Sequence, residues 1–61
     1  MFCGERLKYL RKEKKITQEY LAKELCLSRT SVTNMEFNRI IPPLKTLEKL
    51  SKIFNVSIYY F

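Results

Sequence analysis

The sequence predicts an all-α fold of five short helices in a single compact domain, residues 1–61. Apolar residues recur at three- and four-residue spacing along most of the chain, which is the period of a helix with one buried face. Ser, Thr or Asn residues stand at the boundaries of these segments, where they cap or close helices. The hydrophobic fraction of 46% and the single Gly are consistent with one small, ordered core.

The first helix is predicted over residues 4–14. Leu7 and Leu10 lie three residues apart and form a narrow apolar stripe, and basic residues surround them. Ile16 follows a basic run and is expected to anchor the turn after this helix.

The second and third helices each begin with a residue that can cap a helix. Thr17 precedes the segment 18–25, and its hydroxyl can accept a hydrogen bond from a free backbone N–H of the first turn. Ser28 has the same role for the third helix. We expect the third helix to end near residues 37–38, because Asn tolerates the left-handed conformation that closes many helices.

The last third of the chain contains a connector and two further helices. Two prolines exclude a regular helix from the second half of residues 40–43. Helical spacing returns at Leu44 and ends at Asn55. Ser57 is expected to cap a fifth helix of one turn.

The predicted core lies beneath the second and third helices, and residues of the other helices close it. Its members share helical spacing and apolar side chains. They are Leu7, Leu10, Leu21, Ala22, Leu25, Leu27, Val32, Met35, Leu47, Leu50 and Phe54.

The second and third helices are joined too tightly for a loop. Their apolar stripes meet at Cys26, so Cys26 and Leu27 must reverse the chain. Two short helices joined in this way are typical of a helix-turn-helix, and in a basic protein this motif indicates DNA binding.

Charge favours a polyanionic partner. Twelve Lys and Arg against six Asp and Glu give a net charge of +6 and a pI near 9.6. This balance favours nucleic acid over an anionic membrane surface. The chain has no His and only two Cys, so no metal site, cofactor site or catalytic group is predicted, and an enzyme is the weakest candidate. Without a long apolar segment, a cytoplasmic location and no membrane association are expected.

Several short motifs occur in a familiar order from Gly4 to Phe61. They are L-K-x-L-R, T-Q-x-x-L-A, L-S-R-x-S-V-x-N-M-E, a following proline and V-S-I. In these motifs the chain resembles the Cro/repressor-type (Xre-like) helix-turn-helix family. The resemblance implies a compact five-helix repressor-like DNA-binding domain, bacterial or phage-like, with helices 2 and 3 forming the motif. Cys26 departs from the family pattern, which usually has Gly at this turn.

The exposed face of the third helix is the expected site of base recognition, because the N-terminal residues of a recognition helix contact base edges in the major groove. The resemblance implies this role for Arg29, Thr30, Thr33 and Asn34, and a base or backbone contact for Ser28. Arg29 is the strongest candidate, since its planar guanidinium can donate two hydrogen bonds to guanine.

Phosphate contacts are expected on both sides of that helix. The resemblance implies such a contact for Gln18, at the start of the second helix. Arg39 and Lys45 are predicted basic contacts, and Asn38 can add an amide contact. The resemblance also implies a structural ion pair between Arg11 and Glu36. The remaining lysines are predicted to form a solvated, generally attractive face; they are Lys8, Lys12, Lys14, Lys15, Lys49 and Lys52.

A homodimer is expected, because proteins of this type bind two half-sites as two-fold dimers. The predicted contacts are apolar or aromatic residues that exceed the needs of the core, namely Ile40, Ile41, Tyr59, Tyr60 and Phe61. The alternative is that Phe61 and one Ile complete the core of the monomer and that the tyrosines are simply exposed.

The predicted function is that of a sequence-specific transcriptional regulator that binds double-stranded DNA, with repression of a two-fold operator as the main interpretation. Activation through contact between Glu19 and RNA polymerase is an alternative. An antitoxin or a restriction-modification controller protein would share the fold. A non-specific basic module that binds RNA or a membrane belongs to a different class.

Overall fold

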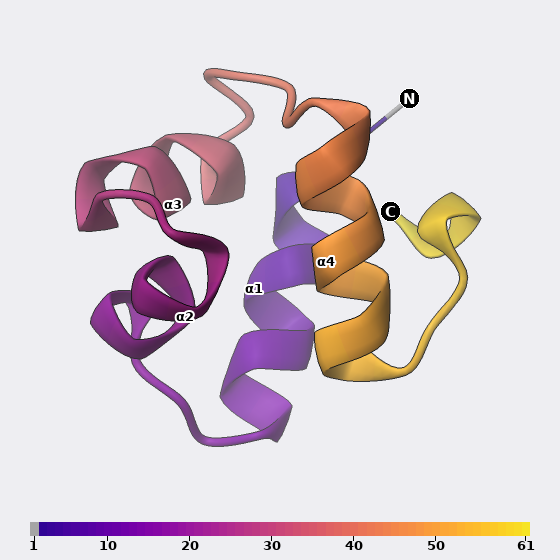
Figure 1. The fold of residues 1–61 in the computed structure, drawn as a ribbon, viewed down its shortest axis with the longest axis horizontal. Coiled ribbons are helices and arrows are strands. Elements are labelled where there is room, and N and C mark those ends of the chain that lie inside the picture. The colour runs from indigo at the N-terminus through magenta and orange to yellow at the C-terminus, as the bar shows by residue number, and fades with distance from the viewer. Residues whose placement is uncertain (1) are drawn as a thin grey trace.

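The computed structural model describes residues 2–61 and contains helices only. The elements are α1 (Gly4–Glu13), α2 (Gln18–Leu25), α3 (Arg29–Glu36), α4 (Leu44–Phe54) and the short 3-10 helix η1 (Ile58–Tyr60). Helix α3 packs against α1 and α2, α2 also contacts α4, and η1 lies against α4 on the side away from α2 and α3 (Figure 1). The all-α prediction is therefore confirmed for the residues that the structure describes.

The prediction of five α-helices is wrong, because the last one is only a three-residue 3-10 turn. Tyr60 N donates to Ser57 O across 3.0 Å, which is the three-residue spacing of a 3-10 helix. Cys3 N donates to Phe61 O across 2.6 Å, so the residue after this turn is bonded to the residue before α1 and lies in the core. Ser57 does cap the turn, accepting from Tyr59 N.

The predicted helix boundaries are confirmed within one or two residues, and so are the caps. Thr17 Oγ1 accepts from Tyr20 N at 3.0 Å, and Ser28 Oγ accepts from Ser31 N at 3.2 Å. Asn38 takes the left-handed conformation that was expected after α3, with φ of 61°, and Asn55, where α4 was expected to end, takes it too, with φ of 54°. Local side-chain chemistry therefore determines where these helices begin and end.

The core agrees with the sequence pattern in all but one of its predicted members. The buried apolar residues are Leu7, Leu21, Ala22, Leu25, Val32, Met35, Leu50, Phe54 and Phe61, and Leu10 and Leu47 are half-buried against them. Leu27 was expected in the core, but it is 38% exposed.

The exposure of Leu27 follows from the turn that precedes it. Cys26 is left-handed, with φ 58° and ψ 38°, and the next backbone amide, that of Leu27, donates back to Ala22 O at 2.8 Å. The chain leaves α2 along this reversal, so Leu27 lies at the edge of the core.

The start of α1 lies directly against the end of α3. A Cβ atom at Gly4 would overlap Met35 O and lie 2.6 Å from Glu36 O, so only Gly permits this approach. Asn38 Oδ1 accepts from Gly4 N at 2.7 Å and caps α1 from outside the helix. This contact fixes the position of α1 relative to the C-terminal end of α3.

Candidate nucleic-acid interface

A buried ion pair connects α1 to α3. Arg11 Nε lies 2.6 Å from Glu36 Oε2, and Nη2 lies 3.3 Å from Oε1. The two residues are only 9% and 4% exposed, and Arg11 Nη1 also donates to Ile16 O at 2.9 Å. The pair therefore joins three segments: α1, the turn after it, and the end of α3.

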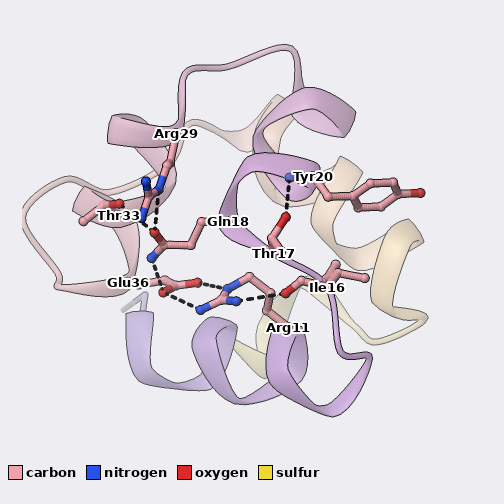
Figure 2. A network of polar contacts seen from close by, with 8 residues as sticks. All are labelled: Arg11, Ile16, Thr17, Gln18, Tyr20, Arg29, Thr33 and Glu36. Atoms are coloured by element: carbon pink, nitrogen blue, oxygen red, sulfur yellow. Dashed lines mark hydrogen bonds and ion pairs between the residues drawn. The ribbon is translucent and has the colours of Figure 1, made fainter.

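Gln18, the first residue of α2, connects this pair to the exposed face of α3. Its Nε2 donates to Glu36 Oε1 at 2.9 Å. Its Oε1 accepts from Thr33 Oγ1 at 3.1 Å and from Arg29 Nε at 3.3 Å. Figure 2 shows these contacts as one network, which runs from the buried carboxylate through the amide to the Arg29 side chain.

The exposed end of this network is the positively charged side chain of Arg29. Arg29 is exposed in the first turn of α3, and its guanidinium keeps donors beyond the single Nε–H that Gln18 accepts. An open depression of about 320 Å³ lies beside it, lined by Arg11, Thr17, Gln18, Glu19 and Arg29. The arrangement therefore presents a positioned cation next to a helix N-terminus, where an anion is favoured.

The sequence model of the helix-turn-helix family matches residues 7–61, which include the whole of α2, the turn and α3. The chain belongs to the Xre-like helix-turn-helix family. In this family member, Cys26 occupies the left-handed position of the turn between α2 and α3.

Curated relatives of this helix-turn-helix chain include a transcriptional activator and a repressor. It is 41% identical over 58 residues to the HTH-type transcriptional activator BcrR of Enterococcus faecalis. It is 38% identical over 58 residues to the immunity repressor protein of Bacillus phage phi105. Both alignments cover 95% of this chain, but they cover only 28% of BcrR and 40% of the phage repressor. The chain thus spans less than half the length of these two relatives.

Two solved structures share the fold of this helix-turn-helix chain. The P22 c2 repressor protein, in complex with synthetic operator 9T, matches with a TM-score of 0.90 and 32% identity over 98% of this chain and 91% of that one. The restriction-modification controller protein C.AhdI from Aeromonas hydrophila matches with a TM-score of 0.81 and 30% identity over 92% and 81% of the two chains.

The other residues expected to contact bases lie along α3 of the helix-turn-helix. Thr30 is exposed, whereas Thr33 and Asn34 are half-buried. Asn34 Oδ1 lies 3.5 Å from Arg39 Nη1, so a predicted base contact and a predicted phosphate contact are neighbours. Ser28 is exposed, although its hydroxyl also caps α3.

Three of the predicted phosphate contacts have exposed side chains, but one of them also has a structural hydrogen bond. Arg39 and Lys45 are exposed. Asn38 is exposed too, but its Oδ1 accepts from Gly4 N, so it has a structural role that sequence analysis missed.

Sequence analysis also missed that Gln18 bonds to Glu36 and Arg29. No local pattern could have shown this, because the partners lie 18 and 11 residues away.

The predicted dimer contacts differ in exposure, and Tyr60 is intermediate: it is half-buried, with its ring edge-on to that of Phe61. Ile40, Ile41 and Tyr59 are exposed, by 42%, 74% and 89%. Phe61 is only 4% exposed and stacks on Phe2, so it belongs to the core of the monomer, as the alternative interpretation had it. Ile41 and Tyr59 border an open apolar depression of about 240 Å³, lined also by Phe2, Leu47, Ile58 and Phe61.

Residues 2–61 contain neither a membrane-spanning helix nor a cluster of metal-ligating side chains. No helix there is long and apolar enough to cross a membrane. No three His, Cys, Asp or Glu side chains of these residues gather where they could hold a metal ion, and both cysteines are free.

Proposed function

We propose that this chain is the DNA-binding domain of a sequence-specific transcriptional regulator, formed by residues 1–61 as one unit. The observation that carries the proposal is the Gln18 amide, which accepts from Arg29 and Thr33 on the exposed face of α3 while it donates to the buried Glu36. A surface cation held in this way is organised before its partner arrives. Preorganisation lowers the entropic cost of binding.

Base recognition would come from the first turns of α3 in the major groove. Arg29 would donate to guanine, a contact that contributes about 1–3 kcal/mol of discrimination. Asn34 would pair with adenine, and the methyl groups of the threonines would contact thymine. The proposed base-contacting set is Ser28, Arg29, Thr30, Thr33 and Asn34.

Backbone contacts would flank α3. The N-terminus of α2, at Gln18, would meet one phosphate, because free N–H groups and the helix dipole favour an anion there. Arg39, Lys45 and the amide of Asn38 would contact the backbone beyond the other end of α3. These contacts position the helix but carry no sequence preference of their own.

The active form would be a homodimer on a two-fold operator. Ile41 and Tyr59 supply exposed apolar area at one depression. The exposed Ile40 precedes Ile41 in the chain, and the half-buried Tyr60 follows Tyr59. Two copies joined there would present two α3 helices to half-sites about 34 Å apart. Phe61 is not included, since the monomer already buries it.

The dimer has a direct test in solution. Tyr59→Asp should shift sedimentation toward the monomer, whereas Tyr20→Asp should not, since Tyr20 is exposed on α2, away from the depression. Equal behaviour of the two variants would remove Tyr59 from the interface.

The proposed regulator acts in the cytoplasm, binds no membrane or cofactor and is not an enzyme. Repression by occupying the operator is the main mechanism, supported by similarity to the phi105 and P22 repressors. Activation is the second candidate, since BcrR is named an activator and Glu19 is exposed on α2, where RNA polymerase could meet it.

The decisive experiment is selection of bound sites from random double-stranded DNA. We expect a two-fold consensus, with half-site centres one helical turn apart. Binding without preference among DNA sequences, or equal binding of RNA, would contradict the proposal.

A controller of a restriction-modification system is a more specific version of the same function, and the similarity to C.AhdI favours it. The selected consensus would separate the two versions. A controller would bind upstream of a nuclease gene, whereas a phage-type repressor would bind elsewhere.

A further inference from the structure

Two cationic side chains from different parts of the chain meet at one exposed aromatic ring. Lys8 Nζ, on α1, lies 5.8 Å from the centroid of the Phe37 ring, and Arg39 Cζ lies 5.1 Å from it. Both distances allow a cation–π interaction. Phe37 follows the last residue of α3 and is 58% exposed, so the ring holds both cations at the surface.

The charges of Lys8 and Arg39 are not neutralised within the described part of the chain. The one ion pair in residues 2–61 joins Arg11 to Glu36. The cations on Phe37 therefore raise the local positive potential at this end of α3, and a phosphate would lower it.

The cluster adjoins the surface proposed to contact DNA. Arg39 Nη1 lies 3.5 Å from Asn34 Oδ1, and Asn34 is a proposed base-contacting residue. A phosphate next to a base that Asn34 contacts would therefore be close to Arg39. Lys8 reaches the same place from α1, which packs against α3.

We propose that Phe37 is a platform that holds Lys8 and Arg39 toward the DNA backbone beyond the C-terminal end of α3. The inference rests on the proposed function and adds to it a phosphate contact from α1 and a positioning role for Phe37. A guanidinium suits a phosphate by its fork of donors, and an ammonium adds a compact charge. Lys8 is thereby distinguished from the other surface lysines.

A competing explanation is that both cations merely stabilise the negative end of the α3 dipole. The two explanations differ in what they predict for DNA binding. A phosphate contact releases counterions, so its loss makes the dependence of log K on log salt less steep by about 0.9. A purely structural role changes thermal stability and leaves this slope unchanged.

The first test compares Lys8→Met with Lys12→Met, using a duplex of the selected consensus and affinities measured over a range of salt. Both lysines are exposed on α1, but only Lys8 contacts Phe37. We expect the magnitude of the slope to fall by about 0.9 per protomer, so by about 1.8 for a dimer on the two-fold consensus, for Lys8→Met, and to stay at the wild-type value for Lys12→Met. An unchanged slope for Lys8→Met, or an equal change for both variants, overturns the inference.

The second test addresses the platform. Phe37→Leu keeps an apolar side chain but removes the ring, whereas Phe37→Tyr keeps the ring. We expect Phe37→Leu to weaken binding and Phe37→Tyr to bind as the wild type does. In the Phe37→Leu background, Lys8→Met should have a smaller effect than in the wild type. Full additivity of the two effects would show that Lys8 and Phe37 act independently.

The outcome for the wild-type chain separates this inference from the proposed function. If the wild type selects no DNA sequence, the proposed function fails and the inference fails with it. If the wild type binds its consensus with a steep salt dependence and Lys8→Met keeps the same slope, only the inference fails. Thermal unfolding of each variant shows whether a change in affinity reflects loss of the fold.

Discussion

Gln18 Nε2 donates to Glu36 Oε1 across 2.9 Å, and this bond fixes the direction in which the Gln18 amide points. The carboxylate requires the NH₂ group on its side, so the amide oxygen faces α3 and accepts from Arg29. The buried ion pair and the exposed Arg29 side chain thus share one amide. The network couples the stability of the domain to the orientation of the side chain proposed to recognise guanine.

Replacing Gln18 by Leu should reduce discrimination between DNA sequences while most of the protein stays folded. The change removes the acceptor that orients Arg29, so part of the about 1–3 kcal/mol of discrimination at its base should be lost. Competition between the consensus duplex and duplexes altered at single positions measures this. Glu19, the exposed residue next to Gln18, provides the control: Glu19→Ala should leave discrimination unchanged. If Gln18→Leu discriminates as well as the wild type, the amide does not orient Arg29.

Replacing Arg11 by Met should destabilise the domain severely. The change leaves the carboxylate of Glu36, which is 4% exposed, without its cation, and loss of one partner of a buried pair costs about 3–5 kcal/mol. That is a large part of the about 5–15 kcal/mol that a domain possesses. Urea unfolding gives the difference. The double variant Arg11→Met/Glu36→Leu should recover part of the loss, because no unpaired charge remains. A double variant less stable than Arg11→Met would contradict this account.

Much of the fold follows from local sequence. The boundaries of α2 and α3 were predicted because Thr17 and Ser28 bond to amides only three residues away. The two errors have different causes. After Ser57 the chain forms only a 3-10 turn, and Phe61, which follows it, is bonded to the distant Cys3. Leu27 is exposed because the left-handed turn at Cys26, the residue before it, directs the chain away from the core.

The candidate site was predictable in its residue types but not in its connections. Helical spacing identifies which side chains of α3 face outward, and Arg29 is among them. It does not show that Gln18 joins Arg29 to Glu36, or that Lys8 meets Phe37, because each contact needs two helices packed together. Such contacts carry no periodic signal in one sequence.

Replacing Gly4 by Ala should destabilise the packing of α1 on α3. The new Cβ would overlap Met35 O, a backbone atom that cannot move without shifting the helix. Forced overpacking costs about 1–3 kcal/mol, although Ala itself is the better helix former. Chemical denaturation measures the difference, and Glu5→Ala is the matched control, since Glu5 is exposed on the same turn. A stability of Gly4→Ala equal to or above that of the wild type would show that α1 can shift at no cost.

Replacing Cys26 by Gly should raise the melting temperature. Cys26 has φ 58° and ψ 38°, and a residue with a Cβ atom in this conformation carries about 1–2 kcal/mol of strain. The greater entropy of Gly in the unfolded chain, about 0.5–1 kcal/mol, offsets part of the gain. A net gain of about 1 kcal/mol corresponds to about 4–8 °C in a domain of this size. Cys26→Ala is the control for loss of the sulfur atom: it keeps the Cβ, so its melting temperature should stay near that of the wild type. A stabilisation of equal size in both variants would trace the effect to the exposed thiol and not to the backbone.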